Sequence, residues 1–141
     1  MTTVFSRIIA GDLPARFVWS DEQAVAFLSV NPLGPGHTLV VPRLEVDRWT
    51  DAPAPLMTHL TSVAHSVGAA IQAVYAPPRV GLMVAGFEVP HLHVHVFPAA
   101  GMAAFDFANA AASTDPAEQD RHASAIRAAL CAAGHRDSVP S

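Results

Sequence analysis

Cysteine is almost absent from this chain, because Cys131 is the only one among 141 residues. A single thiol excludes an internal disulfide and a cysteine-rich zinc site, and we expect no redox chemistry. Charged side chains are also few, at 14% of the residues, and they form no basic cluster that could follow a nucleic-acid backbone. A small anionic substrate is compatible with the formal net charge of -4, because backbone N–H groups and imidazoles can bind phosphate locally.

Long apolar runs are missing as well. No stretch approaches the roughly 18 uninterrupted apolar residues of a membrane span, and Met1 to Arg7 does not have the pattern of a signal peptide. We therefore expect no membrane partner and a cytoplasmic location. Apolar residues still make up 51% of the chain, which is enough for a real core. We predict a single domain over residues 1–141, with a core at about 4–98 and a C-terminal helical extension at about 99–134.

Apolar periodicity and turn residues predict a mixed succession of helices and strands. The expected order is a short helical turn at 4–10, strands at 17–19, 24–30 and 38–41, a long helix at 54–75, strands at 80–84 and 92–97, and a final helix from 116 to about 133. This order suits an antiparallel five-stranded sheet covered on one face, which is an α+β fold.

The helix ends carry their own signals. Thr50 or Asp51 is expected to cap the start of the long helix. The segment Asp115-Pro116-Ala117-Glu118 has the form of a helix start, with an N-cap acid, Pro in the first turn and an acid three residues after the cap. Gly134 is expected as the C-terminal cap, and the chain from His135 onward is expected to be frayed.

Three histidines alternate with apolar residues in the run His91-Leu92-His93-Val94-His95. In a strand, alternate side chains point to the same face, so the imidazoles would stand in a row about 6.5 to 7 Å apart. Leu92, Val94 and Val96 would then face the core. Burying three imidazoles together would leave several polar nitrogens in need of partners, so we expect the histidine face to be a surface or a cleft.

Residue chemistry alone leaves three interpretations of this run. The first is a chance cluster on an exposed strand. The second is a metal site, because imidazole is a common zinc, copper or iron ligand, with Glu88 and His37 as the available further ligands. The third is nucleophilic catalysis at phosphorus, in which the central His93 attacks through one nitrogen while its other nitrogen donates a hydrogen bond. The flanking imidazoles would then donate hydrogen bonds to phosphate oxygens.

The chain resembles the histidine triad (HIT) family, whose motif is His-φ-His-φ-His-φ-φ with φ apolar. Here the motif stands as His91-Leu92-His93-Val94-His95-Val96-Phe97. The resemblance covers roughly Val4 to Pro98 and includes the family's opening segment at Phe5 to Ala15 and its third strand at Gly34 to Pro42. It implies a HIT-like fold and a nucleotide hydrolase or transferase of the phosphoramidase or dinucleoside-polyphosphate type, acting at the α-phosphate without a cofactor.

The resemblance also implies roles for individual residues. His93 matches the family nucleophile, which forms a nucleotidyl-histidine that water then hydrolyses. His37 matches a fourth family histidine, expected to lie beside His91 and orient the site, and His95 matches the member expected to contact phosphate. Family members are commonly homodimers, so a homodimer is expected here. Apolar positions that lie near the nucleoside in the family correspond to Phe5, Ile8, Phe17, Phe27 and Leu39.

Several positions depart from the family pattern. Many members carry an Asp after the second strand that holds the ribose hydroxyls; this chain has Ser29, and we expect Ser29 and Asn31 to bind the substrate. Phosphoramidase-like members have a longer loop with Gln-Ser or Gln-Thr before the triad, whereas this loop contains Glu88. An ionised Glu88 would repel phosphate, and a protonated one could donate a proton to the leaving group. Thr3 and Ser6 replace the paired cysteines that bind structural zinc in some members, so we expect no metal.

We predict that the protein binds a nucleotide-like phosphate compound and hydrolyses it through His93. The main alternative is a binding or sensing protein that keeps the four histidines but turns over slowly. A phosphorus adduct on His93 would separate the two. Attack requires neutral His93, so activity is expected to fall as the pH drops through the imidazole range near ~6.5.

Overall fold

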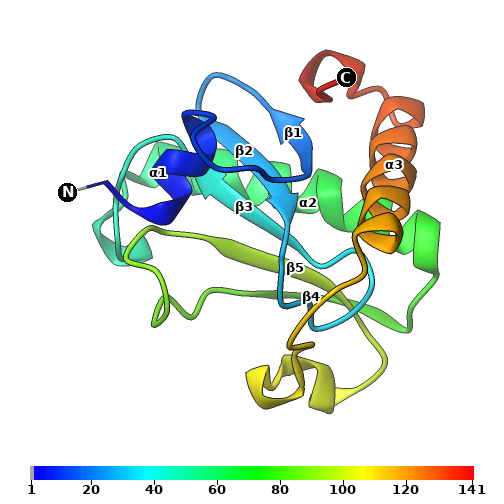
Figure 1. Ribbon diagram of the computed structural model, residues 1–141. Coiled ribbons are helices and arrows are strands. Elements are labelled where there is room, and N and C mark those ends of the chain that lie inside the picture. The colour runs from blue at the N-terminus through cyan, green and yellow to red at the C-terminus, as the bar shows by residue number, and fades with distance from the viewer. Residues whose placement is uncertain (1) are drawn as a thin grey trace.

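Five strands and three α-helices form the framework of the computed structural model, which describes residues 2–141 (Figure 1). The helices are α1 (Val4–Ile9), α2 (Ala54–Tyr75) and α3 (Pro116–Ala132), and the strands are β1 (Phe17–Ser20), β2 (Ala24–Leu28), β3 (Thr38–Pro42), β4 (Arg79–Met83) and β5 (Val94–Ala99). The strands pair antiparallel in the order β1-β2-β3-β5-β4, which confirms the predicted α+β fold. No helix within residues 2–141 is long and apolar enough to cross a membrane.

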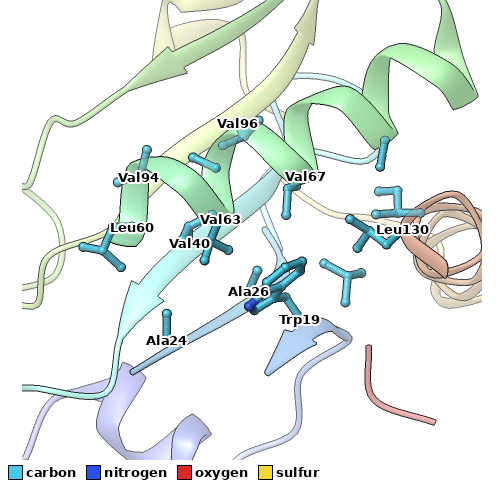
Figure 2. Close-up of a cluster of buried hydrophobic side chains, with 14 of the residues drawn as sticks. Trp19, Ala24, Ala26, Val40, Leu60, Val63, Val67, Val94, Val96 and Leu130 are labelled. Atoms are coloured by element: carbon cyan, nitrogen blue, oxygen red, sulfur yellow. The ribbon is translucent and has the colours of Figure 1, made fainter. Parts of the chain in front are cut away.

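One face of the sheet packs against α2 and α3. Val40, Val94 and Val96 point to this face from the central strands and are almost fully buried. They belong to one cluster with Leu60 of α2 and Leu130 of α3 (Figure 2). The bounds of α2 are those predicted, because its apolar stripe at helical spacing is long and prolines stand on both sides of it.

The opposite face of the sheet carries a second, smaller apolar cluster. Val25, Phe27, Leu39 and Val41 point to this face and pack with Phe5 of α1. The expectation of a sheet covered on one face is therefore incomplete, because α1 covers part of the second face. The same side chains continue into the pocket described below.

The predicted cap of α2 is wrong. Pro53 is the N-cap residue, and no side chain makes a cap hydrogen bond there. Thr50 and Asp51 lie in a 3-10 turn at Trp49–Asp51 instead, and the extended residues after it separate them from the first turn of α2. The Asp51 carboxylate accepts from the Nε of Arg48 at 2.7 Å rather than from the helix.

The ends of α3 agree only in part with expectation. Asp115 is the N-cap residue, but its side chain makes no cap hydrogen bond. Gly134 follows the helix with φ +98°, as a C-terminal glycine should. The prediction of a frayed end is wrong, because a 3-10 turn at Arg136–Ser138 follows and the His135 ring packs on Trp19 with ring centroids 5.3 Å apart.

The last strand is shorter at its start than predicted. β5 begins at Val94, so His91 precedes the strand in an irregular segment. The backbone N–H of Leu92 donates to Val46 O at 2.7 Å, which holds this segment on the loop after β3 instead of on a neighbouring strand. Leu92, Val94 and Val96 nevertheless face the core, as the alternation predicted.

Replacing Gly36 with alanine should destabilise the fold more than replacing Gly11. Both glycines have left-handed backbone, at φ +79° and φ +87°, so alanine costs about 1–2 kcal/mol at either position. A Cβ on Gly36 would lie 2.6 Å from the Tyr75 ring, whereas a Cβ on Gly11 meets nothing within 4 Å. We expect urea denaturation to show an extra loss of about 1–3 kcal/mol for Gly36→Ala over Gly11→Ala. Equal losses of unfolding free energy in the two variants would contradict close packing of Tyr75 against the turn before His37.

Candidate active site

The pairing of β3 with β5 brings His37 and His95 together. Leu39 lies opposite His95 in this antiparallel pair, and His37 comes just before β3, with its Nε2 3.0 Å from Nδ1 of His95. The expectation that His37 lies beside His91 is wrong. The antiparallel register places His91 near the other end of β3, where its Nε2 lies 2.8 Å from the carbonyl oxygen of Pro42.

All four histidines are buried. The exposed fractions are 0% for His91, 1% for His37, 4% for His93 and 6% for His95. Of the two expected settings, an exposed surface or a cleft, the structure has the cleft, because all of them except His91 line a pocket. Every buried side-chain nitrogen and oxygen within residues 2–141 has a hydrogen-bond partner, and these partners offset the cost of removing the imidazoles from water.

The protonation of His91 and His93 follows from their partners. The Pro42 carbonyl can only accept, so Nε2 of His91 carries a hydrogen and Nδ1 of the neutral ring accepts from the Thr3 hydroxyl at 2.7 Å. The carbonyl oxygen of His91 in turn accepts from Nδ1 of His93 at 2.7 Å. Nε2 of neutral His93 is left with a free lone pair. The Phe5 ring packs edge-on against the His93 ring, with centroids 5.0 Å apart.

A second chain of hydrogen bonds orients His95. The backbone N–H of Leu33 donates to Nδ1 of His37 at 2.9 Å, so the hydrogen of neutral His37 lies on Nε2 and is donated to Nδ1 of His95. The hydrogen of His95 therefore lies on its Nε2, for which no described residue is an acceptor. The rings of His93 and His95 are T-shaped with centroids 4.9 Å apart, so this donor stands next to the nucleophile.

Burial favours the uncharged form of His37, His93 and His95. It lowers the pKa of His37 to about 3 and the pKa of His95 to about 4, and the neighbouring imidazoles act in the same direction. Burial also holds the pKa of His93 below its ordinary value, although the bond to His91 O and the Glu88 carboxylate raise it. At neutral pH the site therefore offers N–H donors and a lone pair rather than cations.

A pocket of about 1010 Å³ adjoins this group of histidines. Its walls combine the apolar cluster below α1 with polar groups at the end of β2. Phe17 is not part of the wall and packs on Phe27 instead, with ring centroids 5.8 Å apart. The predicted site residues that line the pocket are His37, His93, His95, Phe5, Ile8, Phe27, Leu39, Ser29, Asn31 and Glu88.

The C-terminal part of the chain closes the pocket, which the sequence interpretation missed. Phe107, residues 110–112, Gln119 and Asp120 line it, and the amide nitrogen of Asn31 donates to the carbonyl oxygens of residues 111 and 112 at 3.1 Å. Asp120 also pairs with Arg16 at 2.7 Å. One signal was available in the sequence: Gln119 begins the buried stripe of α3, where the other members are apolar.

The metal interpretation gains no support. Within residues 2–141, no group of three or more His, Cys, Asp or Glu side chains is arranged to hold a metal ion. Both ring nitrogens of His91 and of His37, and the Nδ1 atoms of His93 and His95, are already in hydrogen bonds. Hydrogen bonds and packing against phenylalanine rings therefore orient the four imidazoles.

Comparison with known proteins agrees with this arrangement. An uncharacterized 13.2 kDa HIT-like protein of Azospirillum brasilense is 39% identical over 102 residues, which cover 67% of this chain and 83% of that protein. The adenylylsulfatase HINT3 of Arabidopsis thaliana is 28% identical over 100 residues, covering 67% of this chain and 51% of its own length. The crystal structure of a zinc-bound histidine triad family protein from Mycobacterium smegmatis has a TM-score of 0.80 at 26% identity and covers 94% of this chain and 96% of that one.

The family model of the HIT domain matches residues 10–102, about two thirds of the chain. That range contains all four histidines and the β3–β5 pairing that joins them. HIT proteins are in general nucleotide-binding hydrolases and transferases. The chain belongs to the histidine triad (HIT) family.

Proposed function

We propose that the protein acts at the α-phosphate of a nucleotide through a nucleotidyl-histidine formed on His93. The observation that carries this proposal is the 2.7 Å contact between Nδ1 of His93 and the carbonyl oxygen of His91. A carbonyl can only accept, so the contact fixes the tautomer in which Nε2 is the nucleophile. His93 lines a pocket whose Phe5 and Phe27 walls suit a nucleobase.

The reaction has two steps. Nε2 of His93 attacks the α-phosphorus and forms a P–N bond while the bond to the leaving group breaks. The N–H of His95 donates to a phosphate oxygen, and the leaving group takes a proton from solvent as it departs past Glu88 at the pocket wall. Water then attacks phosphorus, the P–N bond breaks, and the proton that the water loses goes to solvent, which balances the one taken by the leaving group. The nucleoside monophosphate leaves, and His93 returns to its neutral form.

The charges around the pocket favour an amine leaving group. The charged residues that line it are Arg16, Glu88 and Asp120. Arg16 is paired with Asp120 at 2.7 Å, which leaves the Glu88 carboxylate as the uncompensated charge. A carboxylate attracts a departing amine and repels a departing phosphate chain. A phosphoramidase-type substrate therefore suits this pocket better than a dinucleoside polyphosphate.

The relatives support nucleotide chemistry more firmly than any particular substrate. HINT3 is named an adenylylsulfatase. The M. smegmatis protein is zinc-bound, whereas in this chain the Ser6 hydroxyl and the backbone N–H of Thr3 donate to the Glu45 carboxylate. The backbone N–H of Ser6 donates to the Thr3 hydroxyl oxygen. We propose that the chain needs no structural zinc, and that it acts as a cytoplasmic homodimer.

Intact-protein mass spectrometry after brief incubation with adenosine phosphoramidate should reveal an adenylyl adduct, or released AMP, for the wild type only. His93→Ala should abolish both, because it removes the attacking lone pair. The matched control is His65→Ala, an exposed histidine on α2 outside the pocket, which should react like the wild type. Binding of AMP without adduct or product across a panel of amine and phosphate leaving groups would favour the sensing alternative.

The pH profile of kcat/KM should have an acid limb below the ordinary histidine pKa of ~6.5. The pKa of His93 is lowered in the fold, so the ring stays neutral at pH 6.5 and gains its proton only at lower pH. Activity is then full at neutral pH and falls about tenfold per pH unit below the lowered pKa. Glu88→Gln should move the limb to still lower pH, because the carboxylate raises the pKa of His93. A limb above pH 6.5, or one that Glu88→Gln leaves in place, would contradict this assignment.

Thr3→Val should lower kcat about tenfold with little change in KM, which corresponds to about 1.4 kcal/mol of lost positioning of His91 and, through its carbonyl, of His93. Thr3→Ser keeps both the donor to His91 and the N-cap acceptor for Ser6 N, so it should restore kcat. Thermal melting of both variants measures the separate contribution of the α1 cap. A kcat for Thr3→Val equal to that of the wild type would exclude the positioning role.

A further inference from the structure

Tyr75, the last residue of α2, touches the turn that precedes His37. The Tyr75 ring lies so close to Gly36 that a Cβ on this glycine would be 2.6 Å from a ring carbon and 2.9 Å from the hydroxyl oxygen. Gly36 also has a left-handed backbone, with φ +79°, which glycine adopts without the steric cost of a side chain. The hydroxyl end of Tyr75 therefore fills the space that any other residue at position 36 would need.

A second glycine of the same turn packs against β5. A Cβ on Gly34 would lie 3.0 Å from the backbone oxygen of Pro98, so the backbone of the turn rests directly on the strand. The backbone N–H of His37 donates to the Gly34 carbonyl oxygen at 3.2 Å, which closes the turn. Because β5 is fixed in the sheet, the seating of the turn on this strand depends on the contact with Tyr75.

The turn sets the direction of the His37 ring. The backbone N–H of Leu33 donates to Nδ1 of His37 at 2.9 Å, and Nε2 of His37 lies 3.0 Å from Nδ1 of His95. His95 carries the N–H that the proposed reaction uses to bind a phosphate oxygen. A turn that moved away from β5 would carry Leu33 with it, and the His95 ring would lose the contact that fixes its tautomer.

His122 of α3 holds Tyr75 in place. The Tyr75 hydroxyl oxygen lies 2.7 Å from Nδ1 of His122, and the two rings are T-shaped with centroids 5.5 Å apart. Burial raises the pKa of Tyr75 to about 12, so the phenol keeps its hydrogen at neutral pH. A phenol can donate or accept, and the bond therefore forms with either tautomer of His122. It joins the end of α2 to the first turns of α3, which begins beside it (Figure 1).

We propose that Tyr75 and His122 are positioning residues that keep His37 against His95 and so aim the His95 N–H at the substrate phosphate. This inference rests on the proposed function only for its effect on turnover, because the arrangement of the rings exists without substrate. His122 lies outside residues 10–102, the range that the HIT family model matches. This support of the site therefore comes from the chain's own C-terminal helix.

Tyr75→Phe keeps the ring against Gly36 and removes only the bond to His122. With adenosine 5′-phosphoramidate as substrate, kcat should fall about fivefold, the effect of one hydrogen bond, while KM stays within about twofold. His122→Ala should cause the same loss, and the double variant should lose no more than either single variant, because each breaks the same bond. His122→Asn keeps a polar atom near the place of Nδ1 and should restore most of kcat.

Leu130→Val is the matched control for loose docking of α3. Leu130 is fully buried about two helical turns beyond His122 and does not line the pocket, so this variant weakens packing without breaking the Tyr75–His122 bond. It should lower the melting temperature and leave kcat unchanged. A wild-type kcat in Tyr75→Phe, additive losses in the double variant, or an equal loss of kcat in Leu130→Val would overturn the positioning role.

A measurement without substrate separates this inference from the proposed reaction. Long-range 1H–15N NMR of the imidazoles distinguishes protonated from unprotonated ring nitrogens. At neutral pH the wild type should show His95 with its hydrogen on Nε2, and Tyr75→Phe should show a mixture of both tautomers. An unchanged His95 tautomer in Tyr75→Phe would overturn the inference, even in a protein that turns substrate over. A changed tautomer in a protein without turnover would support the inference and reject the proposed reaction.

Discussion

The antiparallel pairing of β3 with β5 is the contact on which the site depends. It joins chain segments more than 50 residues apart and sets Leu39 opposite His95. Because side chains alternate along paired strands, the same register sends Val94 and Val96 into the core against α2 and turns His95 toward the pocket. A register shift of one residue in β5 would turn Val94 and Val96 toward the pocket and His95 into the core. The large apolar area buried under α2 therefore also fixes where the catalytic rings stand.

The sequence predicts the fold well where local signals agree with tertiary packing. The bounds of α2 follow from a long apolar stripe between prolines, and all five strands lie within a few residues of their expected places. The errors fall where local signals compete with longer-range contacts. Thr50 is a good capping residue by type, yet the chain makes a 3-10 turn there before the helix begins. His135 looks like the start of a loose tail, but it packs on Trp19, which lies in β1.

The sequence identifies many of the site residues, but it does not predict how they are arranged relative to one another. The alternating triad marks His93 as a nucleophile through its chemistry, and family resemblance adds His37. Neither the motif nor the resemblance gives the register of β3 against β5. His37 was therefore expected beside His91, whereas it lies beside His95. Gln119 interrupts the apolar stripe of α3, which signals a buried polar contact, but the sequence does not show which segment the helix packs against. Only the fold shows that α3 brings it to Ser29.

Burial of the imidazoles links the chemistry of the site to the stability of the fold. The pKa of His37 is lowered to about 3 and that of His95 to about 4, whereas both would titrate near ~6.5 in the unfolded chain. The unfolded chain therefore binds more protons below that pH, and the stability contributed by neutral burial is present above pH 6.5 and lost as the pH falls toward 4. The same desolvation lowers the pKa of His93 and keeps its lone pair available at neutral pH. A site that used exposed, charged histidines would avoid this acid sensitivity, but it would give up the neutral nucleophile and the fixed tautomers that the proposed attack on phosphorus requires.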